Sequence, residues 1–117
     1  MRIGVIGGLM RKDRDFVFSI LKDFIKSGDT IVSGGAEGVD TFAREYAKEN
    51  KIQIVEFLPD FKRDGNGAYM ARNALIAEQS DIVLAFPSSS SSGTWHTVGI
   101  AKTLEKRVIV FEEAKKK

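Results

Sequence analysis

The chain has 117 residues, of which 43% are hydrophobic and 29% are charged, and its formal net charge is +2. At roughly 150 residues per typical domain, this length predicts one compact domain over residues 1–117, and the composition excludes disorder, collagen and coiled coil as global descriptions. The chain has no cysteine and one histidine, so the sequence predicts no disulfide, no thiol nucleophile and no metal site.

The first half of the chain alternates short apolar runs with stripes of helical spacing. Residues 2–8 form a β-branched run that ends in two glycines, which is typical of a buried strand. Apolar side chains then recur at helical spacing from residue 16 to residue 25, and Gly28 supplies a stop. Residues 30–32 predict a second strand, and residues 39–50 predict a second helix.

The second half continues the same alternation. We predict a strand at 52–58, a polar loop at 60–67, a helix at 69–80, a strand at 82–86, a helix marked by residues 97–104 and a strand at 107–111. In the helix at 69–80, the spacing of Met70, Ala74 and Ala77 predicts that these three side chains face inward.

Strands that alternate with helices at every step predict an α/β fold. Parallel neighbours need crossover connections, which are usually helical. Because crossovers are right-handed, few strand orders remain, and we predict the order 3-2-1-4-5. The expected architecture is a Rossmann-like three-layer sandwich, with a parallel five-stranded sheet and helices on both faces.

Small residues follow three of the predicted strands, where open parallel sheets bind ligands. Glycine lets backbone amides approach a ligand, and a helix start presents unpaired N–H groups, so these segments predict a phosphate site. A tight turn at the first pair and a flexible loop at the serine tract remain alternatives. The segments are Gly7-Gly8, then Ser33-Gly34-Gly35-Ala36 with Gly38, and the tract Ser88–Ser92 with Gly93 and Thr94.

Four polar side chains near these segments are further candidates. Asp40 lies in a first helical turn, where a carboxylate also has a structural role, and it is the one candidate for catalysis. Arg72 and Asn73 can reach a phosphate or a base edge, or belong to a solvated face. His96 has no orienting partner evident in the sequence, so we predict a surface or capping role.

The run Ser33-Gly34-Gly35-Ala36-x-Gly38-Val39-Asp40-x-x-Ala43, followed by Arg72-Asn73 and Gly93-Thr94, resembles the motifs of the SLOG superfamily. The similarity is to its YspA/YpsA-related branch and extends from residue 3 to residue 111. This resemblance implies a Rossmann-like domain that binds nucleotides or nucleotide-derived ligands, often as a homo-oligomer.

Two relatives within the superfamily imply competing functions. LOG enzymes cleave ribose phosphate from nucleoside monophosphates and carry P-G-G-x-G-T-x-x-E, but here Thr97 stands at the glutamate position. A hydroxyl cannot replace that carboxylate, so whether the chain is an enzyme stays open. The DNA-processing protein A family binds single-stranded DNA, which needs more basic and aromatic groups than this chain has.

The expectation from the sequence is therefore a domain that binds a nucleotide or a related phosphorylated small molecule, as a signal or a substrate. The alternatives are an N-glycosidic hydrolase or transferase and a single-stranded DNA-binding accessory protein. The charge-free run at 82–101 contains Pro87 and many polar groups, so we expect no membrane span. No signal peptide is evident, and a cytoplasmic location is expected.

Overall fold

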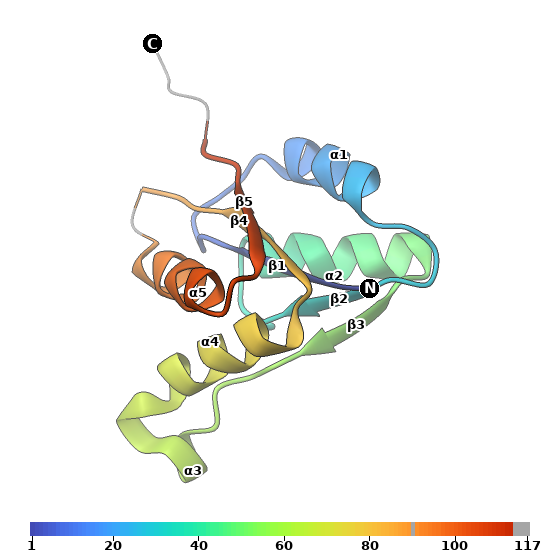
Figure 1. The fold of residues 1–117 in the computed structure, drawn as a ribbon. Helices are drawn as coiled ribbons and strands as arrows, with labels where there is room; N and C mark the ends of the chain where they lie inside the picture. Colours follow the sequence, from blue (N-terminus) through green and yellow to red (C-terminus); the bar gives the residue numbers. More distant parts are fainter. Residues whose placement is uncertain (90, 114–117) are drawn as a thin grey trace.

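A computed structural model describes residues 1–89 and 91–113 of the chain (Figure 1). Strands and helices alternate along it as predicted. The strands are β1 (Arg2–Gly7), β2 (Thr30–Ser33), β3 (Gln53–Glu56), β4 (Ile82–Phe86) and β5 (Arg107–Val110). The helices are α1 (Arg14–Phe24), α2 (Val39–Asn50), α3 (Phe61–Asp64), α4 (Ala68–Gln79) and α5 (Ser92–Thr103), with a 3-10 turn at Gly65–Gly67.

The five strands form one parallel sheet in the order β3-β2-β1-β4-β5, which confirms the predicted topology. The central strand β1 is buried from Ile3 to Ile6, and every residue of β4 is buried. Continuous apolar runs are expected for strands covered on both faces. The edge strands β3 and β5 are only partly buried. The strand order runs outward from β1 to β3 on one side and from β4 to β5 on the other, so the topological switch point lies between β1 and β4.

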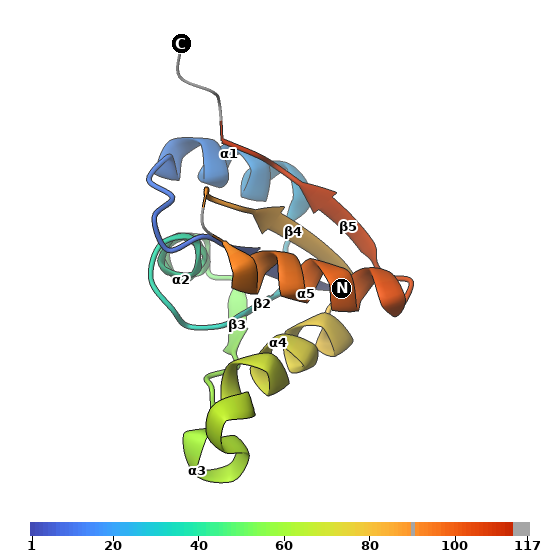
Figure 2. The same ribbon diagram turned by 90° about the vertical axis from the view of Figure 1, so that its left-hand side faces the viewer.

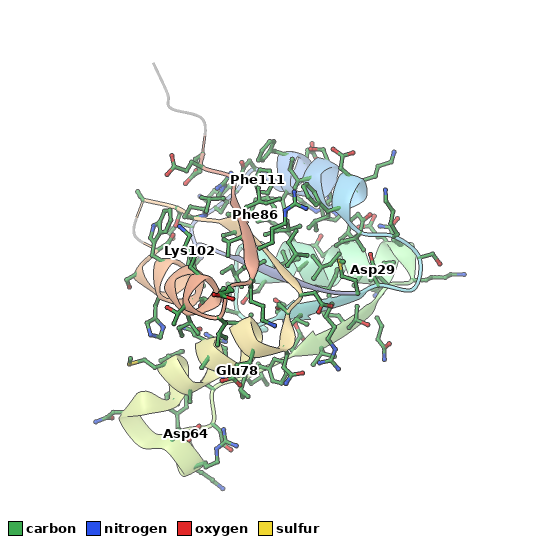
Figure 3. All side chains as sticks on the ribbon, viewed as in Figure 1. Asp29, Asp64, Glu78, Phe86, Lys102 and Phe111 are labelled. Atoms are coloured by element: carbon green, nitrogen blue, oxygen red, sulfur yellow. The ribbon has the colours of Figure 1, made fainter. Side chains whose placement is uncertain are left out.

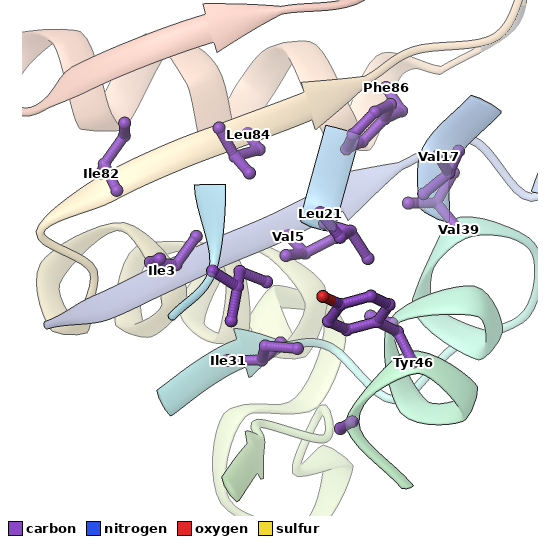
Figure 4. Close-up of a cluster of buried hydrophobic side chains, with 13 residues drawn as sticks. Ile3, Val5, Val17, Leu21, Ile31, Val39, Tyr46, Ile82, Leu84 and Phe86 are labelled. Carbon is purple, nitrogen blue, oxygen red and sulfur yellow. The ribbon is translucent and has the colours of Figure 1, made fainter. Parts of the chain in front are cut away.

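Helices cover both faces of the sheet (Figures 1 and 2). Each face has its own hydrophobic cluster. On one face, side chains of α1 and α2 such as Leu21 and Tyr46 pack on Ile3, Val5 and Leu84 (Figure 4). On the other face, α4 and α5 pack on the sheet through a cluster of smaller side chains. That second cluster contains Ile6, Val32, Ile76, Ala77, Val83, Ala85, Val98 and Ala101.

The segment before α4 differs from the prediction. The expected loop at 60–67 contains the helical turn α3, begun by Asp60, whose side chain accepts a hydrogen bond from the Arg63 amide. Figure 3 shows α3, marked by Asp64, standing away from the sheet. The first turn of α4 extends beyond the sheet toward α3, so Met70 is 60% exposed and its predicted inward position is wrong. Ala77, two turns later, is buried as predicted.

Arg11 holds the loop after β1 in place, which the charged sequence around it does not suggest. Its side chain is fully buried and pairs with both carboxylate oxygens of Asp13. It also donates to the carbonyls of Pro87, at 2.8 Å, and Phe111, at 2.6 Å. The rings of Phe86 and Phe111 stack beside it (Figure 3). Arg11 thereby ties the ends of β1, β4 and β5 together.

No helix within residues 1–89 and 91–113 is long and apolar enough to cross a membrane.

Candidate ligand-binding site

A cavity of about 470 Å³ opens where the strands β1, β2 and β4 end. This volume lies in the range of small-molecule sites. The cavity contains residues from both halves of the chain, because β1 lies between β2 and β4 in the sheet. Its lining residues are Ile6, Gly7, Gly8, Leu9, Gly34, Ala36, Asp40, Tyr69, Arg72, Asn73, Ile76, Ser91, Ser92, Gly93, Thr94 and Thr97.

Most residues of the predicted site line this one cavity. The predicted residues that line it are Gly7, Gly8, Gly34, Ala36, Asp40, Arg72, Asn73, Ser92, Gly93 and Thr94. Three others, Ser33, Gly35 and Gly38, lie outside the lining and shape the loop behind it. Ser90, inside the serine tract, lies outside the described residues.

Gly38 is where the loop before α2 meets the loop after β1. Its φ is +68°, and a Cβ atom there would lie 2.4 Å from the Gly8 carbonyl oxygen and 2.8 Å from Leu9 Cα. Only glycine fits this conformation at this separation. The close approach brings the first two glycine segments to the same side of the cavity.

In the loop before α2 (residues 34–38), several backbone amide and carbonyl groups are hydrogen-bonded to side chains of the protein. The Ala36 amide donates to Asp40 Oδ2 at 3.1 Å. The carbonyl oxygens of Gly34, Gly35 and Ala36 accept hydrogen bonds from side chains of Arg72, Arg44 and Thr41 respectively. Sequence reasoning predicted open amides here, whereas one of those amides is already bonded to a carboxylate.

Asp40 is a buried acid at the cavity wall, with 7% of its surface exposed. Burial raises its pKa, while the Ala36 amide, the Ser33 hydroxyl and the charge of Arg72 act in the opposite direction. Ser33 Oγ itself is buried and has no partner of good hydrogen-bond geometry among the described residues, so its contact with Asp40 is looser than that of Ala36. The carboxylate adds negative potential to this side of the cavity.

Arg72 joins the loop before α2 to helix α4. Its Nη1 donates to the Gly34 carbonyl at 2.8 Å and to the Phe57 carbonyl at 3.4 Å, and its Nε donates to Asn73 Oδ1 at 3.0 Å. No described residue accepts a hydrogen bond from Nη2 in this arrangement. Two of the three guanidinium nitrogens are thus held at the cavity wall by groups of the protein.

Asn73 connects Arg72 to His96. Its Oδ1 accepts from Arg72, which leaves Nδ2 to donate to His96 Nδ1 at 3.3 Å. Asn73 is 8% exposed and lines the cavity, whereas His96 lies outside the lining. His96 therefore has an orienting partner, which the predicted surface or capping role did not include.

Among the described residues, neither α2 nor α5 has a side chain that caps its first amides, but the segments before the two helices differ. The Ser91 hydroxyl turns back and bonds to the backbone and hydroxyl of Ser88, and it makes no capping bond to the helix. The helical hydrogen bonds of α5 begin with the Trp95 amide, which donates to the Ser91 carbonyl. The preceding amides of Ser92, Gly93 and Thr94 belong to the first turn, at the positive end of the helix dipole.

Sequence reasoning missed the apolar part of the lining. Tyr69 and Ile76 stand three residues before Arg72 and three after Asn73, so all four side chains share one face of α4. This helical spacing is the feature of the sequence that could have identified Tyr69 and Ile76 as lining residues. Within the ranges that the structure covers, no group of three or more acidic, histidine or cysteine side chains is arranged to hold a metal ion.

Comparison with known proteins adds a family and a fold. The family model described as YspA, cpYpsA-related SLOG family matches residues 1–63, which is more than half of the chain. No curated protein is significantly similar in sequence.

Three solved structures share the fold. DNA processing protein A from Helicobacter pylori, described for its single-stranded DNA binding mode, has a TM-score of 0.77 at 22% identity over 94% of this chain and 64% of that one. DNA processing protein A from Streptococcus pneumoniae has a TM-score of 0.79 at 20% identity over 93% and 49%. The structural-genomics target TM1055 has a TM-score of 0.73 at 22% identity over 92% and 71%. This chain thus spans about half to two-thirds of the two DNA processing proteins.

Proposed function

Because the chain belongs to the YspA, cpYpsA-related SLOG family, we propose that its cavity binds a nucleotide or a related phosphorylated small molecule. The observation that supports this most is the start of α5, whose first residues line the cavity and whose amides no described side chain caps. A helix start of this kind is suited to bind an anion.

The phosphate would lie on the first turn of α5. The amides of Ser92, Gly93 and Thr94 supply donors there, and the helix dipole favours negative charge. A Cβ atom placed on Gly93 would meet nothing within 4 Å, so an oxyanion has room to approach this turn. The Arg72 guanidinium, through its remaining nitrogen, would balance part of the charge.

The uncharged part of the ligand would lie toward the loop before α2. The carboxyl oxygens of Asp40 accept hydrogen bonds from hydroxyl groups such as those of a sugar. Asn73 lines the cavity beside this wall, and its hydrogen bond to His96 links it to α5. The carboxyl group of Asp40 on one side and the amides of the α5 start on the other would therefore orient a ligand that carries a phosphate at one end and hydroxyls beside it.

The side chains favour binding over cleavage of an N-glycosidic bond. Thr97, at the position of the glutamate in LOG enzymes, donates its hydroxyl to the Gly93 carbonyl at 3.0 Å. It supplies no carboxylate to stabilise a positively charged sugar or to activate water. Asp40 is the one acidic side chain in the lining, so release of free base that is lost in Asp40→Asn would instead support the hydrolase.

Ligand-dependent stabilisation tests the proposal. The melting temperature of the full chain is measured with nucleoside monophosphates, ribose 5-phosphate, inorganic phosphate and the corresponding nucleosides. A ligand at a hundred times its Kd stabilises the folded state by about 2.7 kcal/mol, so phosphorylated compounds are expected to raise the melting temperature and nucleosides are not. A panel with no shift, or equal shifts with and without phosphate, would overturn the proposal.

Single-stranded DNA binding is a second candidate, supported by the fold shared with DNA processing protein A. Against it, four arginines already pair with carboxylates, in Arg11–Asp13, Arg14–Glu45, Arg44–Glu56 and Arg63–Asp64. Such pairing leaves less positive charge for a phosphate backbone. Gel retardation of a 5′-phosphorylated oligonucleotide that weakens steeply with salt, without binding of free nucleotide, would favour the DNA candidate.

A further inference from the structure

Tyr69 is an aromatic side chain at the outer end of the cavity. Residues 69, 72, 73 and 76 of α4 line the cavity along one helical face. Ile76 is buried at the inner end, while Tyr69, two turns earlier, is 56% exposed. Between them lie the polar side chains of Arg72 and Asn73, so the Tyr69 ring is the large, exposed apolar surface that α4 contributes to the cavity.

The Tyr69 ring is held in place by two neighbours. Phe61 of α3 packs edge-to-face against it, with 5.3 Å between ring centroids and an interplanar angle of 79°. The Arg72 guanidinium lies 5.7 Å from the centroid of the same ring. Phe61 is itself 54% exposed. Helix α3 therefore holds an aromatic side chain at the molecular surface, in contact with the Tyr69 ring. A ring fixed in this way needs little ordering when a ligand binds.

Tyr69 stands at the level of the proposed phosphate site. The hydrogen bond between Asn73 and His96 brings α4 and α5 side by side. Tyr69 lies one turn before Asn73, and Ser92 lies one turn before His96, so both occupy the first turns of neighbouring helices. Packed helix axes are roughly 8–10 Å apart, a separation that a sugar can span between a phosphate and a planar ring.

Resting on the phosphate site proposed above, we infer that Tyr69 stacks on a planar ring of the ligand, which makes the ligand a phosphate that carries an aromatic base and not a bare sugar phosphate. Leu9, 62% exposed in the loop after β1, is the other exposed apolar side chain of the lining. It offers a second apolar contact for the same ring. Stacking accepts any planar base, so this contact selects for the presence of a ring over its identity.

The test compares two ligands that differ only in the base. Affinities of adenosine monophosphate and ribose 5-phosphate are measured by calorimetry for the full chain and for Tyr69→Ala, Tyr69→Phe and Phe61→Ala. We expect wild type to bind the nucleotide more tightly, and Tyr69→Ala to lose about tenfold to a hundredfold of that affinity. Tyr69→Phe keeps the ring and should stay within about twofold of wild type, and ribose 5-phosphate affinity should stay unchanged in all variants.

Phe61→Ala removes the ring that packs against Tyr69 and leaves the cavity lining unchanged. We expect it to lower the affinity for adenosine monophosphate by less than Tyr69→Ala does, and to leave the affinity for ribose 5-phosphate unchanged. Equal affinity of the wild type for the two ligands, or equal losses for both ligands in Tyr69→Ala, would overturn the stacking inference while leaving the phosphate site intact. Failure of both ligands to bind wild type would overturn the phosphate site itself. Because Tyr69 is more than half exposed, the variants should fold, which their melting temperatures without ligand verify.

Discussion

The cavity lies between two glycine-containing helix starts that use their backbone groups differently. In the loop before α2, an amide and three carbonyls are bound by side chains of Asp40, Thr41, Arg44 and Arg72. Before α5, Ser88 and Ser91 bond to each other, and no described side chain binds the amides of the first turn. The backbone of the first loop is thus partly bound by side chains of the protein, whereas we propose that the second helix start offers its amides to a ligand.

This difference shows that a glycine-rich helix start is not by itself an anion site. Glycine at residues 35 and 38 provides positive φ and a close backbone approach, whereas Gly93 leaves open space in front of a helix. The charges agree with this division. Asp40 stands in the first turn of α2, and the first turn of α5 contains no acidic residue. We therefore propose a structural role for the first loop and phosphate binding for the second helix start.

The largest expected effect is on stability and comes from the loop before α2. Gly38→Ala places a Cβ atom against the Gly8 carbonyl in a backbone region that disfavours side chains. The two penalties together should lower the free energy of unfolding by about 3 kcal/mol, measured by chemical denaturation.

The matched control is Gly93→Ala at the other helix start. Its Cβ would meet no atom within 4 Å, and alanine favours helix over glycine by up to about 1 kcal/mol. Stability should therefore stay equal or rise slightly. Equal losses in both variants would remove the distinction between the loops.

The next effect is on binding and comes from the first turn of α5. Ser92→Pro removes one amide proton at a helical position that tolerates proline. Loss of a hydrogen bond to a charged group, about 1.5–3 kcal/mol, should weaken nucleoside monophosphate binding by about tenfold or more, measured by calorimetry. Ser92→Ala keeps the amide and should bind as wild type does. If the two variants bind equally well, phosphate does not lie on this turn.

The smallest effect is on the pH dependence of stability and comes from Asp40. Burial raises its pKa above the value in the unfolded chain, so the folded state binds more protons between those two values. The unfolding free energy contributed by Asp40 therefore falls as pH rises through that interval, and it stays low at higher pH. Asp40→Asn removes this contribution.

The measurement is the difference in unfolding free energy between Asp40→Asn and wild type from about pH 4 upward. The difference should grow in favour of the variant and then level off. A constant difference across this range would mean that the carboxylate is not penalised by burial.

Much of the fold follows from the sequence, because short apolar runs at 2–8 and 82–86 and helical stripes between them leave few parallel topologies. The two helix starts could also be located, since the sheet order brings Gly34 and Gly93 to one edge. Periodicity could not reveal which partners the polar groups bind. The spacing of four residues between Ala36 and Asp40 does not show whether the amide meets the carboxylate or a ligand.

The burial of two residues, Met70 and Arg11, also could not be predicted from the sequence. Met70 has the periodicity of a buried residue, yet α4 begins beyond the sheet and leaves the side chain largely exposed. Arginine is usually exposed, yet Arg11 is buried where the ends of three strands meet. The homo-oligomeric state, the cytoplasmic location and the extent of the domain stay predictions from the sequence.

The most direct test of the central claim is a crystal structure of the chain with a bound nucleoside monophosphate. We predict phosphate oxygens within hydrogen-bonding distance of the Ser92, Gly93 and Thr94 amides, with the Ala36 amide still bonded to Asp40. A phosphate on the Ala36 amide with Asp40 displaced, or a phosphate outside this cavity, would contradict it.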